Sequence, residues 1–497
     1  MENKSTKLAV VYDIETLFSC FTYTAMDVNN KTIYQYVIHK DRNDLNELIK
    51  HLKNCAVGIG FNNINFDYPI IHYLLTSNLN NLTAEEICKL IHQKAQDIIN
   101  QQNQEEFNTI VAIPQKKWLI FQVDLFKMWH YNNKNRKTSL KALEISMNFP
   151  NVMESPIDHN KEDITIEEVE DILEYNLNDV LATYEFYKKS ADKIALRKKL
   201  MNKYNIPCIS WNNGKIGEQL ILKLYCQKTG LDIWDVKERR TYRPRIELSK
   251  CVPDITFESK EFNDLLNYFK SLTISSTKGE ANKQLIFKGI KYDYGSGGVH
   301  ACIKPGIYES NDKFIIKSCD VASLYPNLAI QYDFYIEHLG KEFLDVYKGD
   351  IVDVRMAEKA KGKNGDKAIV DGFKEAANVP YGKSNEVFSF LYDPLYTMKT
   401  TIHGQLLMSK LCEMLSNIED SQILMVNTDG LEIMIPVYKQ DEYTSICKKW
   451  EELTRLTLEF SDYKKLWVRD INNYGCIDFK GKIKNKGAFE VDKAIVS

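Results

Sequence analysis

Apolar and polar positions in the first 190 residues follow two different periods. Short apolar runs at 7–15, 55–62 and 118–126 are typical of buried strands, whereas residues 82–99 and 164–200 repeat apolar positions at helical spacing. Thr83, with Glu86 three positions later, predicts a capping box at the start of the first of these helices. Strands that alternate with helices predict an α/β domain.

The second half of the chain has a different pattern. Residues 191–290 are mixed and weakly informative, and from Lys291 onward glycine-rich turns, strands and two helical tracts alternate. An apolar strand ends at Asp320 and turns into a helix. At 423–435 an apolar run, a turn at Asp429-Gly430 and a run of period two predict a β-hairpin. The stretch 359–367 is predicted to be an exposed loop.

Composition limits the class of protein. The length of 497 residues suggests about three domains, and the 44% of apolar residues is enough for ordinary packed cores. A net charge of −3 argues against a protein that coats nucleic acid by bulk attraction, but it leaves room for a nucleic-acid enzyme with a local basic groove. The eleven cysteines include no C-x-x-C pair, which argues against zinc or iron–sulfur sites and fits a reducing compartment. No apolar run approaches the roughly 20 residues of a membrane span, so we expect an intracellular protein with no membrane partner.

Four carboxylates fall where strands and helices could bring them together. Asp13 and Glu15 end a strand two positions apart, so their side chains point to the same side. Asp67 follows the second strand, and Asp179 lies one helical turn after Tyr175. Taken separately, each has an ordinary explanation: a solvated turn for the acid pair, and a half-buried tyrosine beside a surface acid for the helix.

Together, D-x-E at 13–15, N-x-x-x-F-D at 62–67 and Y-x-x-x-D at 175–179 resemble the 3′–5′ proofreading exonuclease of family B DNA polymerases, over residues 8–187. Phosphodiester hydrolysis of this kind uses two hard cations roughly 4 Å apart, and hard cations prefer carboxylates. The resemblance implies that Tyr175 orients the attacking water and that Asn62 and Phe66 position the frayed strand end. The cation ligands that it implies are Asp13, Glu15, Asp67 and Asp179.

The strand-to-helix junction at 315–330 carries a longer pattern. As an ordinary junction it would need only Pro326 near the start of its helix. Its D-x-x-S-L-Y-P matches motif A of the same family. The resemblance implies that Asp320 is a metal ligand and that the backbone at Ser323 and Leu324 cradles a triphosphate. It further implies that Tyr325 packs under the sugar and excludes a 2′-hydroxyl, so that the substrate is a deoxynucleotide.

The helical stretch 372–387 places Lys374, Asn378 and Tyr381 on one face, and a lysine fits poorly on a packed face. The pattern K-x-x-x-N-x-x-Y-G matches motif B of the family. By that resemblance Lys374 contacts the triphosphate, Asn378 and Tyr381 touch the nascent base pair, and Gly382 allows the backbone to approach closely.

The predicted hairpin turn departs from the family. An acid at such a turn either caps it or holds a metal. Motif C of the family usually reads D-T-D-S, whereas this chain has Asn427-Thr428-Asp429-Gly430. In the family the second acid pairs with the motif A acid, so the resemblance implies an intact pair, Asp320 and Asp429, and a tolerated change at Asn427.

Three weaker signals have ordinary alternatives. The turn at 294–300 resembles the Y-x-G-G element of the family, by which Gly297 and Gly298 would let backbone amides approach a template phosphate; otherwise it is a bare turn. Lysines alternate at 480–486, so one strand face is predicted to be basic, either a solvated face or a grip on the primer backbone by Lys484 and Lys486. A further pair, Arg355 and Lys359, either is an ordinary surface pair or steers the incoming triphosphate.

The expected fold is an α/β, RNase H-like exonuclease domain followed by an α+β polymerase palm with short helical fingers. The predicted ranges are 1–190 for the exonuclease, 191–290 for a connecting region, 291–345 and 392–497 for the palm, and 346–391 for the fingers. The thumb of the family is expected to be missing or truncated, so the chain is either a fragment, part of a split polymerase or a minimal enzyme.

The expected activity is compact, phage-like, template-directed DNA synthesis with proofreading, using two Mg²⁺ per site, with Mn²⁺ as a substitute. Primer–template DNA and dNTPs are the expected partners, with a second polypeptide that supplies the thumb or processivity as a further one, in the cytoplasm of the cell or host. Two alternatives stay open: a nuclease only, and a binding subunit that a partner completes.

Overall fold

The computed structural model describes residues 7–103, 112–133, 138–158 and 160–490. These residues form two compact units that meet in the sequence at Asn213 and Gly214. Each unit is described by itself. The five domain ranges expected from the sequence are finer than this division and stay a prediction.

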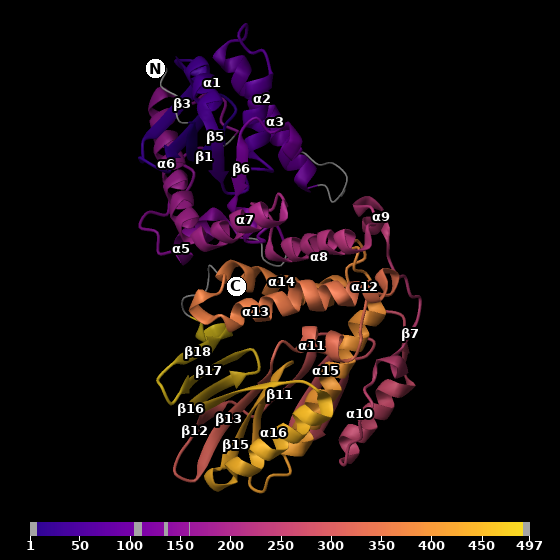
Figure 1. The fold of residues 1–497 in the computed structure, drawn as a ribbon. Coiled ribbons are helices and arrows are strands. Elements are labelled where there is room, and N and C mark those ends of the chain that lie inside the picture. Colours follow the sequence, from indigo (N-terminus) through magenta and orange to yellow (C-terminus); the bar gives the residue numbers. More distant parts are fainter. Residues whose placement is uncertain (1–6, 104–111, 134–137, 159, 491–497) are drawn as a thin grey trace. The chain divides into compact units, whose positions relative to one another are not determined.

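The first unit is built on a mixed six-stranded sheet of order β4-β3-β2-β1-β5-β6 (Figure 1). The pairs β1–β5 and β5–β6 are parallel, and β1–β2, β2–β3 and β3–β4 are antiparallel. The strands are β1 (Leu8–Thr16), β2 (Phe21–Asp27), β3 (Ile33–His39), β4 (Arg42–Asn43), β5 (Cys55–Gly60) and β6 (Phe121–Asp124).

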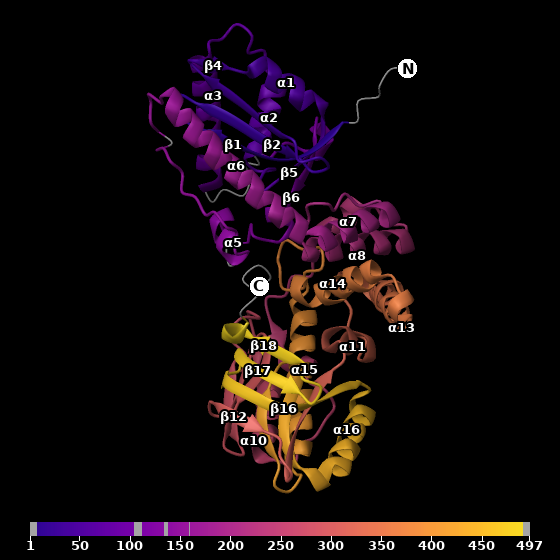
Figure 2. The same cartoon turned by 90° about the vertical axis from the view of Figure 1, so that its left-hand side faces the viewer.

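Helices cover both faces of this sheet. Val10, Tyr12 and Ile14 of β1 pack into one apolar core with α1 (Leu45–Asn54), α2 (Asp67–Thr76) and α3 (Ala84–Asn103). On the other face Val11 packs with Val180 of α6 (Ile166–Lys189), which crosses β1 and β2 (Figure 2). Because side chains alternate along a strand, the positions that follow Val11 at intervals of two, 13 and 15, face α6 as well.

The helical tract expected at 164–200 is confirmed as helical, and it consists of two helices. The first, α6, ends at Lys189, and α7 (Ala191–Tyr204) follows after Ser190. The buried hydroxyl of Ser190 accepts a hydrogen bond from the Trp129 indole and donates one to the carbonyl of Phe186. This tertiary contact fixes the break.

Arg197 of α7 is fully buried, and its hydrogen bonds fix the last residues of the first unit. Its guanidinium donates to the backbone oxygen of Trp211 at 2.8 Å and to Oδ1 of Asn213 at 2.9 Å. Further bonds reach the carbonyl oxygens of Lys193 and Met128. The first unit also contains α4 (Leu125–Met128) and α5 (Leu140–Ser146).

The second unit is built on a large sheet in which every recorded strand pair is antiparallel, of order β18-β17-β16-β13-β15-β14-β11-β10-β9, with β12 paired to β16. Its strands are β9 (Lys283–Phe287), β10 (Ile290–Gly295), β11 (Gly298–Cys302), β12 (Gly306–Glu309), β13 (Phe314–Val321), β14 (Gln422–Val426), β15 (Gly430–Pro436), β16 (Leu458–Asp470), β17 (Asn473–Asp478) and β18 (Ile483–Lys486). A separate two-stranded sheet pairs β7 (Ile246–Glu247) with β8 (Thr273–Ile274).

A buried helix, α15 (Pro394–Leu415), packs against β11 and against α16 (Gln440–Thr454), where the Trp450 indole donates to the carbonyl of Leu407. Two shorter helices, α11 (Leu324–Gln331) and α14 (Lys367–Lys383), pack on α15 and on each other. The other helices are α8 (Asn213–Thr229), which begins at the last residue of the first unit, α9 (Ile233–Glu238), α10 (Lys260–Ser271), α12 (Gly340–Asp345), the π-helix Val346–Asp353 and α13 (Val354–Ala360).

Several expectations about elements are confirmed. The hairpin at 423–435 exists as β14 and β15, and the capping box exists, with the amide of Thr83 donating to Glu86 and the amide of Glu86 to Thr83. The basic strand face is only half right, because Lys480 and Lys482 lie in the turn between β17 and β18. The mixed α/β and antiparallel architecture agrees with the expected fold class at this coarse level. None of the described helices is long and apolar enough to cross a membrane.

Candidate active sites

The first site lies on the α6 face of the six-stranded sheet. Oxygen atoms of Asp13 and Glu15 on β1 and of Asp179 on α6 lie within 4.8 Å of one another. The Asn176 amide, on the turn of α6 before Asp179, donates to Oδ2 of Asp13 at 2.7 Å. Tyr175, one turn before Asp179 on the same helix, lowers the pKa of the Asp179 carboxyl. The structure therefore brings together four of the residues predicted for this site.

Burial of this group raises the pKa of each carboxyl. The pKa of Glu15 rises to about 8 through burial, the charge of Asp179 and the charge of Asp67. Burial and the charge of Asp67 also raise the pKa of Asp13 well above its usual range, and burial raises that of Asp179 to about 6. These carboxyls keep protons near neutral pH because burial disfavours their charged forms. Such a group of oxygen donors suits a hard divalent cation.

Asp67 begins α2 and is nearly fully buried. Its pKa is raised to about 7 by burial, and its charge acts on both Asp13 and Glu15. Its oxygens lie outside the group of three within 4.8 Å, so it is a neighbour of that group rather than a member.

The loop before α2 places the residues predicted to hold a strand end. Asn62 has a left-handed backbone, with φ of 63°, and its amide donates to Asp124, as does the amide of Ile64. Phe66 packs against the core under α2 and α3. Asp124 is fully buried and acts as the anchor of this loop, a role that was not anticipated.

Two charged side chains of α5 were missed in the sequence. Lys141 lowers the pKa of Glu15 and Asp179 and pairs with Glu154. Glu144 is fully buried, neither of its carboxylate oxygens has a hydrogen-bond partner among the described residues, and burial with the charge of Asp179 raises its pKa to about 7. Their proximity depends on how α5 packs on α6, which no local pattern in the sequence reports.

The second site lies in the second unit, at one end of the β13–β15 pair. Asp320 is the last residue but one of β13 and lies opposite Gly430, and Asp429 lies in the turn before β15. A Cβ atom at 430 would lie 1.9 Å from Oδ1 of Asp320. The glycine at 430 therefore gives room for the Asp320 carboxylate. Burial raises the pKa of Asp320, Lys484 lowers it, and the charges of Asp429 and Glu459 raise it.

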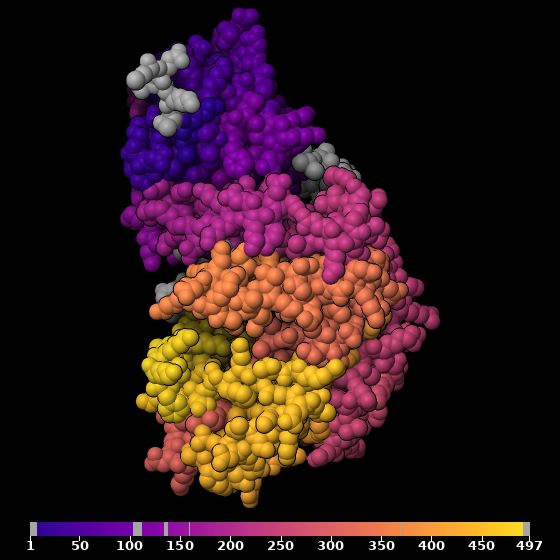
Figure 3. All heavy atoms as spheres, viewed as in Figure 1, coloured from indigo at the N-terminus to yellow at the C-terminus, as the bar shows by residue number. Residues whose placement is uncertain are grey.

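A cavity of about 930 Å³ opens over these two acids. Figure 3 shows the recess between the orange surface of α13 and α14 and the yellow surface of β16–β18. It collects the residues predicted for a nucleotide site together with the two strand lysines. Those that line it are Asp320, Ser323, Leu324, Tyr325, Arg355, Lys359, Lys374, Asn378, Tyr381, Gly382, Asn427, Asp429, Lys484 and Lys486.

Two aromatic rings and one arginine shape this cavity. The rings of Tyr325 on α11 and Tyr381 on α14 stack with centroids 3.9 Å apart. Arg355 is nearly buried, and its Nη1 donates to the hydroxyl of Ser323 at 3.4 Å, which is not the behaviour of an ordinary surface residue. Ser323 has a left-handed backbone, with φ of 48°, at the junction between β13 and α11.

The glycine-rich turn between β10 and β11 accepts hydrogen bonds from residues around this cavity. Hydroxyls of Tyr325 and Thr428 donate to the carbonyl of Gly297, at 3.3 and 3.1 Å. The amide of Gln405 on α15 donates to the carbonyls of Gly295 and Gly298. Gly298 has φ of 134°, and a Cβ there would lie 2.5 Å from the Thr428 hydroxyl, so only glycine fits this position.

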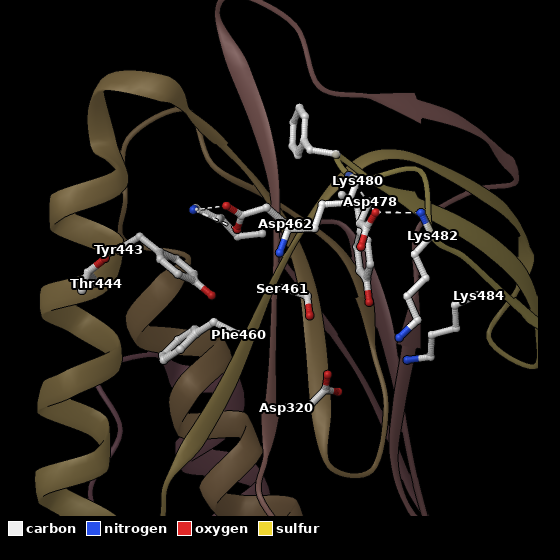
Figure 4. A pocket seen from close by; sticks show the side chains of 13 residues that line it. Asp320, Tyr443, Thr444, Phe460, Ser461, Asp462, Asp478, Lys480, Lys482 and Lys484 are labelled. Carbon is white, nitrogen blue, oxygen red and sulfur yellow. Dashed lines mark hydrogen bonds and ion pairs between the residues drawn. The ribbon is translucent and has the colours of Figure 1, made fainter. Parts of the chain in front are cut away.

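A second cavity, of about 710 Å³, shares Asp320 and Lys484 with the first. Figure 4 shows Asp320 at one end, Lys482 and Lys484 on one side, and Tyr443 and Phe460 on the other.

No model of a known protein family matches the sequence, and no curated protein matches it. Among solved structures the chain is similar to the family B DNA polymerase from the hyperthermophilic archaeon Pyrobaculum calidifontis, with a TM-score of 0.51 and 14% identity. The match covers 96% of this chain and 60% of that one. At this identity the likeness is one of fold. The fold thus resembles that of a family B DNA polymerase, and the chain spans about 60% of the length of that protein.

Proposed function

We propose that the protein is a DNA-directed DNA polymerase that also carries a 3′–5′ exonuclease. The observation that carries the proposal is the cavity over Asp320 and Asp429, because it gathers two acids, a basic wall and two stacked tyrosines. The acid group of Asp13, Glu15 and Asp179 in the other unit supports the exonuclease. The fold similarity to a family B DNA polymerase agrees with both.

Both acid groups offer hard oxygen donors, and burial raises the pKa of Glu15 in the first and of Asp320 in the second, so both groups fit Mg²⁺. Cations bound there would neutralise phosphate charge and favour attack by an oxygen nucleophile. Side chains of the protein position the reactants. Lys374 and Arg355 face the triphosphate, Tyr325 lies under its sugar, and Tyr175 orients a water at the exonuclease site. Fixed charges of this kind do most of the catalysis in phosphoryl transfer.

The test is primer extension with Mg²⁺ and four dNTPs, in protein whose exonuclease is silenced by Asp13→Ala and Glu15→Ala. Asp429→Ala should lower incorporation by about a hundredfold or more, because it removes one acid of the pair. Asn427→Ala should only weaken incorporation, because position 427 offers no charge. Equal activity of Asp429→Ala and its parent would overturn the assignment.

A nuclease without synthesis is the second candidate, and the observation that favours it is the amide at Asn427. In that case the unmutated protein shortens a labelled primer and never lengthens it. A third outcome, weak primer–template binding that tightens with a second polypeptide, would identify the chain as a subunit that a partner completes.

A further inference from the structure

A buried carboxylate beside the second site has no role in the function just proposed. Glu432 on β15 is 3% exposed, and its Oε2 has no hydrogen-bond partner among the described residues. Leaving a carboxylate oxygen buried and unsatisfied is costly, so such a group needs an explanation.

The strand register places Glu432 on the same side of the sheet as Asp320. Opposite residues of an antiparallel pair point to one face, and here Asp320 faces Gly430 while Ser318 faces Glu432. Glu432 is therefore the diagonal neighbour of Asp320, at a spacing of about 7–8 Å between the two backbones. Carboxylates of an aspartate and a glutamate at that spacing reach far enough to share one cation between them.

Charge around Glu432 also comes from the site. After burial, the largest effect on its pKa is the charge of Asp320, and Asp429 acts in the same direction. Lys484 acts in the opposite direction. Burial and these charges together raise the pKa of Glu432 to about 8.

A second buried glutamate of the same unit behaves differently. Glu413 on α15 is 2% exposed, and its Oε1 accepts bonds from the amides of Glu258 and Ser259 and from the Ser259 hydroxyl. Its Oε2 pairs with Lys410. The fold thus satisfies Glu413 with its own donors, whereas Oε2 of Glu432 has no hydrogen-bond partner among the described residues.

We propose that Glu432 is a third carboxylate of the Asp320–Asp429 cation site, and that it supplies the charge that Asn427 lacks. The inference rests on the proposed function. It would explain why an amide is tolerated at 427. The site would still have three acids, Asp320, Asp429 and Glu432, with the third on strand β15 instead of in the turn.

The test measures cation binding rather than turnover. Mn²⁺ is titrated by electron paramagnetic resonance into protein with Asp13→Ala and Glu15→Ala, so that only the second site is read. Glu432→Gln keeps the shape and removes the charge, and it should weaken Mn²⁺ binding by about tenfold or more. The matched control is Glu413→Gln, which should lower the unfolding temperature and leave Mn²⁺ binding unchanged.

Thermal unfolding gives an independent readout. Without a cation at pH 8, Glu432→Gln should unfold at a higher temperature than its parent, because a buried charge is gone, and Mn²⁺ should stabilise it less. Adding Asn427→Asp to Glu432→Gln should recover Mn²⁺ binding. If binding is not recovered, the proposal that Glu432 supplies the charge missing at position 427 is overturned.

The failures can be told apart. If Asp429→Ala weakens Mn²⁺ binding and Glu432→Gln does not, the role of Glu432 is overturned while the site stands. If neither variant changes binding, the second unit has no cation site of this kind, and the proposed function falls with the inference.

Discussion

The contact between Asp320 and Gly430 is the tightest constraint in the second site. Gly430→Ser would place a Cβ 1.9 Å from Oδ1 of Asp320, so the carboxylate must rotate away. We expect incorporation to fall by about tenfold to a hundredfold, since displacement of a reacting group by about 1 Å costs that much. Primer extension with Mg²⁺ and four dNTPs measures this loss.

The control for this variant is Gly349→Ala, because a Cβ at 349 meets no atom within 4 Å. That variant should extend a primer as its parent does. Full activity of Gly430→Ser would mean that Asp320 can work in a second rotamer, and the fit between 320 and 430 would lose its importance.

At the scale of elements, the glycine-rich turn depends on one side chain of α15. Gln405→Ala removes both hydrogen bonds to the carbonyls of Gly295 and Gly298 inside the protein. We expect a loss of about 1–3 kcal/mol of stability, and a lower rate of incorporation because Tyr325 and Thr428 bond to the same turn.

Denaturant unfolding and primer extension of the same preparation check both effects. The matched control is Gln422→Ala, an exposed glutamine on β14, which should change neither. An unstable variant with normal incorporation would show that the turn is a packing element and not part of the site.

Elements with a local signal could be predicted from the sequence, and those set by distant contacts could not. The hairpin at 423–435 and the capping box at Thr83 follow from neighbouring residues. The break at Ser190 depends on Trp129, which lies far away in the sequence. Glu432 also escaped notice, because the alternation in 431–435 shows which residues share a face but not that Glu432 is buried.

The same limit applies to the two sites. The motifs and their spacing predicted the residues that line the cavity over Asp320. The shared direction of the Asp13 and Glu15 side chains follows from the alternation of side chains along a strand. Lys141 and Glu144 belong to α5, and nothing within that helix indicates that it would pack beside Asp179. Roles that motifs imply for these residues stay predictions.

For the whole molecule, the raised pKa values determine how stability changes with pH. Glu15, Asp67 and Asp179 have pKa values of about 8, 7 and 6 in the folded chain, against about 4 in an unfolded one. Between these limits the three carboxyls bind more protons in the folded state, so their contribution to stability is greatest near pH 4 and falls as the pH rises toward 8.

Thermal unfolding in a chelator across pH 4.5–8.5 measures this fall. Ca²⁺ should raise the unfolding temperature more at pH 8 than at pH 5, because it replaces the lost protons as countercharge. The double variant Glu15→Gln with Asp67→Asn should show a flatter profile. Stability that rises with pH in the chelator would contradict the assignment of these acids as a cation site.

The burial of Arg197 has a practical consequence for making the first unit alone. Its guanidinium is surrounded by oxygens that the chain supplies as late as Trp211 and Asn213. A fragment cut at 205 would keep Arg197 but lose these acceptors, and it would leave a buried cation without these partners. A gene fragment for the nuclease-like half should therefore extend at least to codon 213, well beyond the last recognisable motif residue, Asp179.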